Sequence, residues 1–362
     1  MFTISKNMHH KPFYDPKKSY QENCEQGPFG LFFKPQKYEN AQEPRFSFLG
    51  QLVFAPFGIP AGPLPNSRFV KAALDMGFDL PVYKTVRTRK YPCHPWPNVI
   101  GVDLEGALTL EKIRSGLVAK NNYAPPLSIT NSFGVPSSDP TIWQKDLAQA
   151  VSYAKKGQVV IGSFQGTREK GGVDSSLVAD FVLGAKLIKE TGAKILELNF
   201  SCPNEKTPDL VCFDSELVLR ICEAVKNEIG SIPLIIKLAY FEDEHNLRKL
   251  VEKVGKLVSG IAAINTLPCA IRDRSGNQAL PGEGRLVSGI CGDGVRWAGL
   301  DMVKRLKTLR TEMNLNYTII GVGGVSTPKD YRGYLACGAD AVMSATGAMW
   351  NPLLAQEIKK YV

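Results

Sequence analysis

Short apolar runs recur along the chain and alternate with longer amphipathic stretches, with loops rich in Gly, Asn or Pro after the runs. The runs predict strands at Leu80–Lys84, Leu127–Thr130, Val159–Gly162, Ile195–Asn199, Leu234–Leu238, Gly260–Asn265, Tyr317–Gly321 and Ala341–Ser344. The amphipathic stretches predict helices at Ser67–Met76, Pro140–Lys155, Ser176–Glu190, Asp214–Ile229, Glu244–Leu257, Val295–Thr311 and Thr327–Cys337. Strands that alternate with helices pair in parallel, and eight such units close a (β/α)₈ TIM barrel of the α/β class.

The pattern alone does not show closure, so an open, doubly wound sheet is the alternative fold. Residues 1–45 are polar and lack a sustained period, which predicts an N-terminal extension that wraps the domain or stays loose. We therefore expect the catalytic (β/α)₈ barrel domain at residues 46–362, with the chemistry after the extension. Residues 46–56 alternate well enough to predict a hairpin across the bottom of the barrel.

The composition is that of an ordinary globular protein, with 362 residues of which 44% are hydrophobic and 22% charged. No apolar run approaches the ~18 residues that a membrane-spanning helix needs. The N-terminus lacks the apolar core of a signal peptide, so we expect a cytoplasmic protein without a membrane anchor. The net charge of +9 comes mostly from Lys and Arg at helical spacing among acidic residues, which favours a solvated surface over a nucleic-acid site.

The eight cysteines are scattered without a C-x-x-C pair, which argues against a disulfide framework or a structural zinc site. None of the four histidines ends an apolar strand. A histidine-based metal centre or catalytic triad therefore has little support, and we expect no metal.

Asparagine side chains end several of the predicted strands or follow them closely. In a barrel the C-terminal ends of the strands form the active site, so Asn131, Asn199, Asn204 and Asn265 are expected at one mouth. An amide offers both a hydrogen-bond donor and an acceptor, which suits a planar heterocycle with C=O and N–H groups. A single Asn is more often a turn former, but four equivalent positions favour a ligand site.

Glycine follows the seventh predicted strand in Gly321-Val322-Gly323-Gly324, and Ala345-Thr346-Gly347 follows the eighth. Glycine also serves tight turns. At the ends of strands seven and eight, however, these residues predict the phosphate site usual for this barrel.

Two lysines, Lys84 and Lys237, finish apolar strands, where a buried ammonium needs an anion or an electron-rich heterocycle. Either lysine could form a Schiff base in an aldolase, stabilise negative charge on a reduced flavin, or reach solvent at the rim.

Cys202 lies in the loop Asn199-Phe200-Ser201-Cys202-Pro203-Asn204, directly after a predicted strand. A lone cysteine is usually a small core residue, but these polar surroundings favour an exposed, reactive thiol. No histidine neighbours it in sequence, so a role as proton acid or base fits better than one as nucleophile.

Together these motifs resemble the dihydroorotate dehydrogenase family over about residues 46–352. The most specific matches are Glu197 to Asn204, Lys84-Thr85, Asn131-Ser132-Phe133-Gly134, Ile264-Asn265-Thr266 and Ile320 to Val325. The resemblance implies FMN as cofactor, bound by Ala61, Gly62, Lys84, Asn199, Lys237, Asn265, Gly289, Gly292, Gly323, Gly324, Ala345 and Thr346. It implies substrate contacts from Lys84, Asn131, Phe133, Gly134, Val135, Asn199, Asn204, Asn265 and Thr266.

The resemblance further implies that dihydroorotate is oxidised to orotate in pyrimidine biosynthesis, with Cys202 and Lys237 as catalytic residues. Cys202 would take the proton from C5 while hydride leaves C6 for flavin N5. A cysteine at this position resembles the soluble class, which implies a cytoplasmic homodimer. The electron acceptor stays open between fumarate, a nicotinamide cofactor reached through an electron-transfer subunit, and a quinone.

Other readings of the same motifs stay open. A dihydropyrimidine dehydrogenase of the dihydrouracil type shares the cysteine loop but normally carries iron–sulfur modules, for which this chain has no clustered cysteines. A tRNA-dihydrouridine synthase usually adds a helical RNA-binding domain after the barrel. A Schiff-base aldolase and a non-catalytic FMN-binding protein are the remaining alternatives.

Overall fold

Eight parallel strands form the centre of the protein in a computed structural model, which describes residues 10–40, 42–125, 127–168, 171–201 and 210–362. They pair in the order β4-β3-β15-β14-β11-β10-β9-β8, and the parallel bridge between Val82 and Ile161 joins the two ends. The strands are β3 (Phe57–Ile59), β4 (Leu80–Pro81), β8 (Ile161–Phe164), β9 (Ile195–Asn199), β10 (Leu234–Leu238), β11 (Gly260–Ala263), β14 (Thr318–Val322) and β15 (Ala341–Met343). The predicted (β/α)₈ barrel is therefore confirmed.

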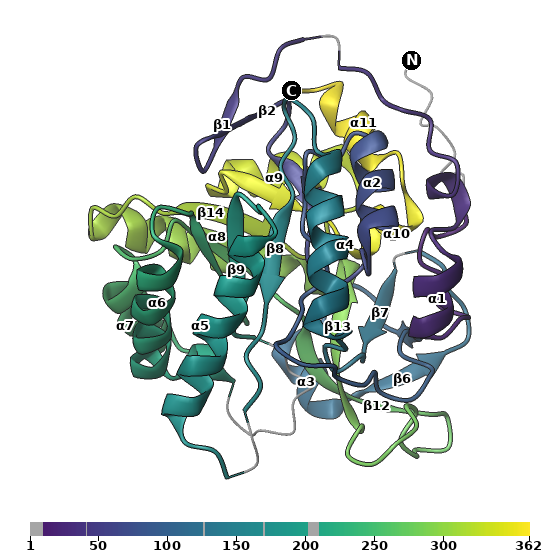
Figure 1. Cartoon of the computed structure of the whole chain (residues 1–362). Helices are drawn as coiled ribbons and strands as arrows, with labels where there is room; N and C mark the ends of the chain where they lie inside the picture. The colour runs from purple at the N-terminus through teal and green to yellow at the C-terminus, as the bar shows by residue number, and fades with distance from the viewer. Residues whose placement is uncertain (1–9, 41, 126, 169–170, 202–209) are drawn as a thin grey trace.

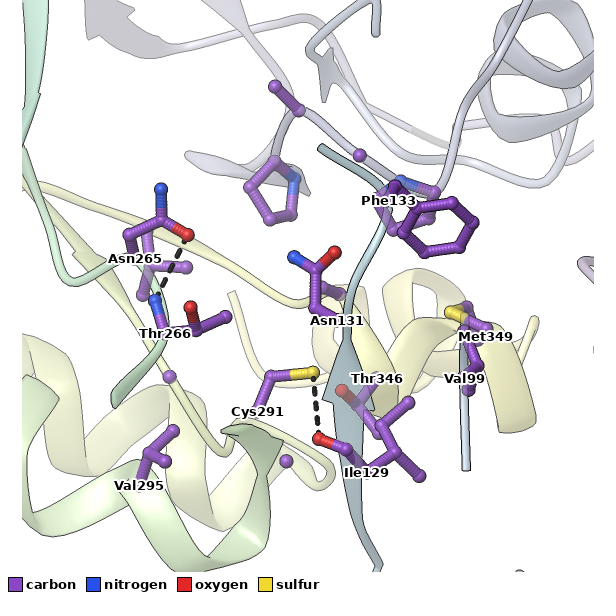
Figure 2. Close-up of a pocket in the computed structure, with 18 of the residues that line it drawn as sticks. Val99, Ile129, Asn131, Phe133, Asn265, Thr266, Cys291, Val295, Thr346 and Met349 are labelled. Atoms are coloured by element: carbon purple, nitrogen blue, oxygen red, sulfur yellow. Dashed lines mark hydrogen bonds between the residues drawn. The ribbon is translucent and has the colours of Figure 1, made fainter. Parts of the chain in front are cut away.

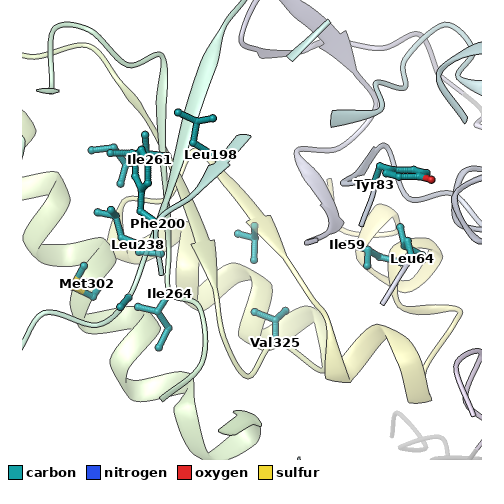
Figure 3. Close-up of a cluster of buried hydrophobic side chains, with 14 of the residues drawn as sticks. Ile59, Leu64, Tyr83, Leu198, Phe200, Leu238, Ile261, Ile264, Met302 and Val325 are labelled. Carbon is teal, nitrogen blue, oxygen red and sulfur yellow. The ribbon is translucent and has the colours of Figure 1, made fainter. Parts of the chain in front are cut away.

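Helices cover the outside of the barrel, as Figure 1 shows. All seven predicted helices are confirmed within a few residues, as α2 (Ser67–Asp75), α4 (Pro140–Tyr153), α5 (Asp174–Glu190), α6 (Ser215–Ile229), α7 (Glu244–Val254), α8 (Arg296–Glu312) and α9 (Pro328–Cys337). Side chains of Asn66, Asp139, Asp214, Asp243 and Thr327 cap the N-termini of five of them. One apolar core lies between strands and helices, and Figure 3 shows part of it.

A hairpin closes the N-terminal end of the barrel. Strands β1 (Phe46–Phe48) and β2 (Gln51–Val53) pair antiparallel, as predicted. Phe48 and Val53 are buried and belong to the same apolar cluster as Leu80, Ile235 and Ile320 inside the barrel. The predicted place of the hairpin at the barrel bottom is thus confirmed.

One predicted barrel strand is wrong. Residues 127–130 belong to β7 (Ser128–Asn131), which pairs antiparallel with β13 and lies outside the barrel. The barrel instead uses β3, which pairs with β15 and β4. The β7 run is almost fully buried, so its apolar pattern looks like that of a barrel strand, whereas β3 is short and directly follows Pro56.

A second sheet is built from two insertions into the barrel. The first, after β4, supplies β5 (Gly101–Asp103), β6 (Leu117–Lys120) and β7, with α3 (Leu110–Ser115) between β5 and β6. The second, after β11, supplies β12 (Leu267–Arg272) and β13 (Val287–Gly292). The five strands pair in a ring in the order β12-β13-β7-β5-β6. Figure 1 places this sheet at the end of the molecule away from the hairpin.

The described part of the N-terminal extension packs on the barrel. It contains α1 (Tyr20–Gln26), started by a capping box of Ser19 and Glu22, and the short helix η1 (Gly30–Phe32). Phe13 is fully buried and stacks on Phe32, with ring centroids 4.2 Å apart. Of the two predicted arrangements, one wrapped around the domain and one loose, the described part of the extension has the wrapped one.

Short helices complete the described chain. η2 (Val211–Phe213) precedes α6, η3 (Asp293–Val295) precedes α8, and α10 (Thr346–Trp350) and α11 (Leu354–Lys359) follow the last strand. None of the helices within the described ranges is long and apolar enough to cross a membrane.

Candidate active site

A cavity opens at the C-terminal ends of the barrel strands, where they meet the second sheet and the N-terminal extension. The empty space in it, with the open mouth included, is ≈ 1180 Å³. Figure 2 shows Asn265 and Thr266 on one side, Asn131 and Phe133 on the other, and Cys291 near Ile129. Polar side chains from several barrel strands therefore face one open cavity.

Glycines form one end of the cavity. Gly323 and Gly324 follow β14 with φ values of +131° and +66°, which L side chains rarely adopt. A Cβ atom at Gly324 would lie 2.5 Å from the Cβ of Arg296. After β15, the Thr346 hydroxyl is buried and has no hydrogen-bond partner among the described residues. Main-chain N–H groups and a hydroxyl at two adjacent strand ends form an anion site.

Amide side chains are held in place by a hydrogen-bond network at the ends of β9 and β11. Asn199 donates from Nδ2 to Oε1 of Gln165 at 2.8 Å. Its Oδ1 accepts from the main-chain N–H of Ser201 at 3.2 Å and from Nδ2 of Asn265 at 3.3 Å. Oδ1 of Asn265 in turn accepts from the N–H of Thr266 at 3.0 Å. The network fixes the amide planes before a ligand arrives.

A buried lysine lies in the cavity wall on β10. Lys237 is 6% exposed, and burial lowers its pKa, although Glu197 on β9 opposes the fall. Burial raises the pKa of Glu197, which accepts at Oε1 from the Ser163 hydroxyl at 3.1 Å. Its Oε2 has no partner within the described residues. An anionic group of a ligand would complete the surroundings of the ammonium.

The turn after β7 exposes unpaired main-chain N–H groups. Gly134 has φ +75° and Val135 has φ +52°, a strained conformation for a β-branched residue. Arg87 donates to the carbonyl of Val135 from Nε at 3.0 Å and to that of Gly134 from Nη2 at 3.5 Å. The N–H groups of both residues donate to no acceptor in the described part of the chain. Consecutive N–H groups of this kind form a nest for an anion.

The N-terminal extension contributes two tyrosines to the cavity lining. The rings of Tyr14 and Tyr20 stand edge-on to Phe133, with centroid distances of 5.8 and 6.0 Å. Lys84 is 7% exposed and also lines the cavity. Burial raises the pKa of Cys93 to about 11, and the nearby charge of Lys84 opposes the rise. The extension and Lys84 thus lie at the same end of the site.

A family model described as dihydroorotate dehydrogenase matches residues 118–362, about two thirds of the chain. The chain belongs to this family. A dihydroorotate dehydrogenase from Dictyostelium discoideum is 38% identical over 359 residues, which are 96% of either chain. A dihydroorotate dehydrogenase B (NAD(+)) catalytic subunit from Listeria welshimeri is 30% identical over 49% of this chain and 57% of its own.

A solved structure supports the fold of the family. The crystal structure of DHODH from Eimeria tenella in complex with ferulenol superposes with a TM-score of 0.69, covering 91% of this chain and 87% of that one. At 18% identity it supports the architecture alone. The membership predicted from sequence motifs is confirmed by the family model and the Dictyostelium relative.

Most residues predicted for the dihydroorotate dehydrogenase site line the one cavity. They are Ala61, Gly62, Lys84, Asn131, Phe133, Gly134, Val135, Asn199, Lys237, Asn265, Thr266, Gly292, Gly323, Gly324, Ala345 and Thr346. Gly289 lies in β13 opposite Asn131 and outside the lining. Cys202 and Asn204 lie outside the described residues.

Several lining residues were missed from sequence, among them Tyr14, Tyr20, Cys291 and Met349. The Ser19-x-x-Glu22 capping box was a usable signal for α1, but nothing local marks Tyr14 as a cavity residue. Within the described ranges, no group of His, Cys, Asp and Glu side chains could hold a metal ion. The seven described cysteines are free thiols.

Proposed function

We propose that this protein oxidises dihydroorotate to orotate with FMN as cofactor, a step of pyrimidine biosynthesis. The observation that carries the proposal is 38% identity to a dihydroorotate dehydrogenase along nearly the whole length of both chains. The cavity supports it, because an anion site, an amide network and a buried lysine all line it.

The residues present fit FMN. Gly323, Gly324 and Thr346 would hold its phosphate, because they offer N–H groups and a buried hydroxyl at one end of the cavity. A Cβ atom at Gly62 would meet nothing within 4 Å, so this glycine leaves open space for a ring. Lys237 would meet the electron-rich pyrimidine end of the flavin. When bound, FMN supplies the acceptor for a hydride.

The opposite side of the cavity fits dihydroorotate. The N–H groups of Gly134 and Val135 would bind its carboxylate. Asn131, Asn199 and Asn265 would pair with the ring C=O and N–H groups, and Lys84 would add a positive charge. The remaining proposed substrate contacts come from Phe133, Asn204 and the buried hydroxyl of Thr266. The remaining proposed cofactor contacts come from Ala345 and Gly292.

The proposed chemistry removes one proton and one hydride from adjacent carbons. The Cys202 thiolate accepts the proton from C5, and the C–H electron pair at C6 leaves as hydride, so a C5–C6 double bond forms. A cysteine with this role also supports a cytoplasmic protein of the soluble class. A homodimer and a separate electron-transfer subunit are proposals from the same resemblance, and the mass of the purified particle tests the first.

Anaerobic mixing of the yellow protein with dihydroorotate tests the function. We expect the flavin absorbance to bleach with dihydroorotate and not with dihydrouracil, which lacks the carboxylate. Cys202→Ala should keep FMN and orotate binding while flavin reduction slows by at least about 100-fold, the usual range for a lost general base. If dihydroorotate leaves the flavin oxidised, the proposed function is wrong.

A further inference from the structure

Tyr14 lines the cavity, and its hydroxyl group is buried without a hydrogen-bond partner in the described part of the chain. Tyr14 is 3% exposed, and its Oη atom forms no hydrogen bond within the described residues. A buried hydroxyl without a partner costs roughly 1–3 kcal/mol. Because the side chain lines a ligand cavity, a ligand is the natural source of the missing acceptor.

The backbone holds Tyr14 firmly at this position. On one side, the N–H of Phe13 donates to the carbonyl of Met349 at 3.2 Å, next to the strand ends. On the other side, the N–H of Asp15 donates to Oδ1 of the fully buried Asn23 at 2.8 Å. Main-chain hydrogen bonds on both sides therefore fix the position of Tyr14 in the site.

The surroundings of Tyr14 indicate which part of a ligand it meets. Its ring stands at 88° to that of Phe133, 5.8 Å away, and Phe133 directly precedes the Gly134–Val135 turn that lines the same cavity. Burial raises the pKa of Tyr14 well above 10, so the phenol stays protonated and can donate a hydrogen bond, which is strongest when the acceptor is an anion.

We propose that Tyr14 is a substrate-binding residue whose hydroxyl donates a hydrogen bond to the carboxylate of the bound acidic pyrimidine. The N-terminal extension then completes the carboxylate end of the site, opposite the amide network. The inference rests on the proposed function and adds a contact from outside the barrel.

Calorimetric titration of the FMN-loaded protein with orotate tests the proposal. Tyr14→Phe removes only the hydroxyl, and we expect the Kd for orotate to rise at least about 10-fold, as for a hydrogen bond to a charged group. The loss should be smaller for the neutral carboxamide of orotate. The ligand-free variant should be at least as thermostable as the original, because it loses a buried hydroxyl that has no partner.

Tyr331→Phe is the matched control. Tyr331 is also 3% exposed with an unpartnered hydroxyl, but it lies on α9 outside the cavity lining. Its variant should bind orotate within twofold of the original. An unchanged orotate Kd in Tyr14→Phe, or an equal loss for the carboxamide, overturns the inference alone. Absence of orotate binding by the original protein overturns the proposed function together with it.

Discussion

At the scale of single residues, buried polar side chains gather at the C-terminal ends of the barrel strands. Lys237, Glu197 and Thr266 are all at most 6% exposed, and Oε2 of Glu197 and Oγ1 of Thr266 have no partner in the described chain. A fold keeps such groups at a cost unless another molecule completes them. Lys237 and Thr266 both line the cavity, which supports a polar cofactor and a polar substrate.

Lys237 gives a prediction at this scale. Lys237→Met keeps the length of the side chain and removes only its charge. We expect FMN affinity to fall at least about 10-fold, because a charge-assisted hydrogen bond is lost. Titration of the apoprotein with FMN, followed by flavin fluorescence, measures it. Lys253→Met is the control, because Lys253 is partly exposed and its Nζ lies 2.7 Å from Oε1 of Glu216. This variant should bind FMN with a Kd within twofold of the original. An equal loss of FMN affinity in both variants contradicts the role assigned to Lys237.

How many site residues the sequence predicts depends on their position. Lys237 and Asn199 each end or nearly end an apolar strand, so the barrel rule places both at the mouth. Tyr14 reaches the same mouth from a distant segment through packing of Phe13 and Phe32, which leaves no local pattern. Contacts between remote segments are tertiary information that periodicity does not contain.

At the scale of elements, the connection from β14 to α9, which passes close to the start of α8, depends on glycine. A side chain at Gly324 meets a left-handed backbone and the Cβ of Arg296 at 2.5 Å. By contrast, a Cβ atom at Gly333, within α9, meets nothing within 4 Å. A side chain is therefore expected to be tolerated at Gly333 and to cause strain at Gly324.

Gly324→Ala should weaken FMN binding by at least about 10-fold, because the turn must shift away from the cofactor phosphate. A left-handed backbone at a residue other than glycine costs about 1–3 kcal/mol. Gly333→Ala should bind FMN normally and gain up to about 1 kcal/mol of stability from its helical propensity. FMN titration and urea unfolding of both variants measure these effects. Normal FMN affinity in Gly324→Ala would place the phosphate elsewhere.

The elements also show why one strand was misassigned. Both β7 and the barrel strands are buried on their two faces, so both give continuous apolar runs. Membership of a barrel depends on the partner strand, and Ile129 pairs with Cys291 far along the chain. The predicted number of eight barrel strands is still right, because the barrel contains β3 in place of the misassigned strand. β3 directly follows Pro56 and was not predicted.

At the scale of the whole molecule, the C-terminal helix ties distant segments together through one buried ion pair. Nζ of Lys359 on α11 lies 2.7 Å from Oδ1 of Asp79, and their side chains are 6% and 0% exposed. Lys359 also donates to Oδ1 of Asn40 at 3.0 Å, in the N-terminal extension. Oδ2 of Asp79 accepts from the N–H of Ala55 at 2.7 Å. The pair joins the extension, the barrel bottom and the end of the chain.

Lys359→Met should therefore destabilise the protein strongly, since it leaves a buried carboxylate without its cation, a change that costs about 3–5 kcal/mol in buried pairs. Burial raises the pKa of Asp79 to about 6, and Lys359 opposes that rise. Removing the ammonium raises this pKa further. A folded-state pKa above the unfolded value gives stability at low pH that is lost as pH rises through the folded pKa.

The stability deficit of Lys359→Met should consequently be larger at pH 8 than at pH 5, as measured by urea unfolding at both values. Lys189→Met breaks an exposed pair with Glu228, whose charged atoms are 3.6 Å apart, and should cost less than about 1 kcal/mol at either pH. A loss of unfolding free energy in Lys359→Met that is instead small, or equal at both pH values, contradicts this prediction. Asp79 would then be solvated, and α11 would not hold the N-terminal extension to the barrel.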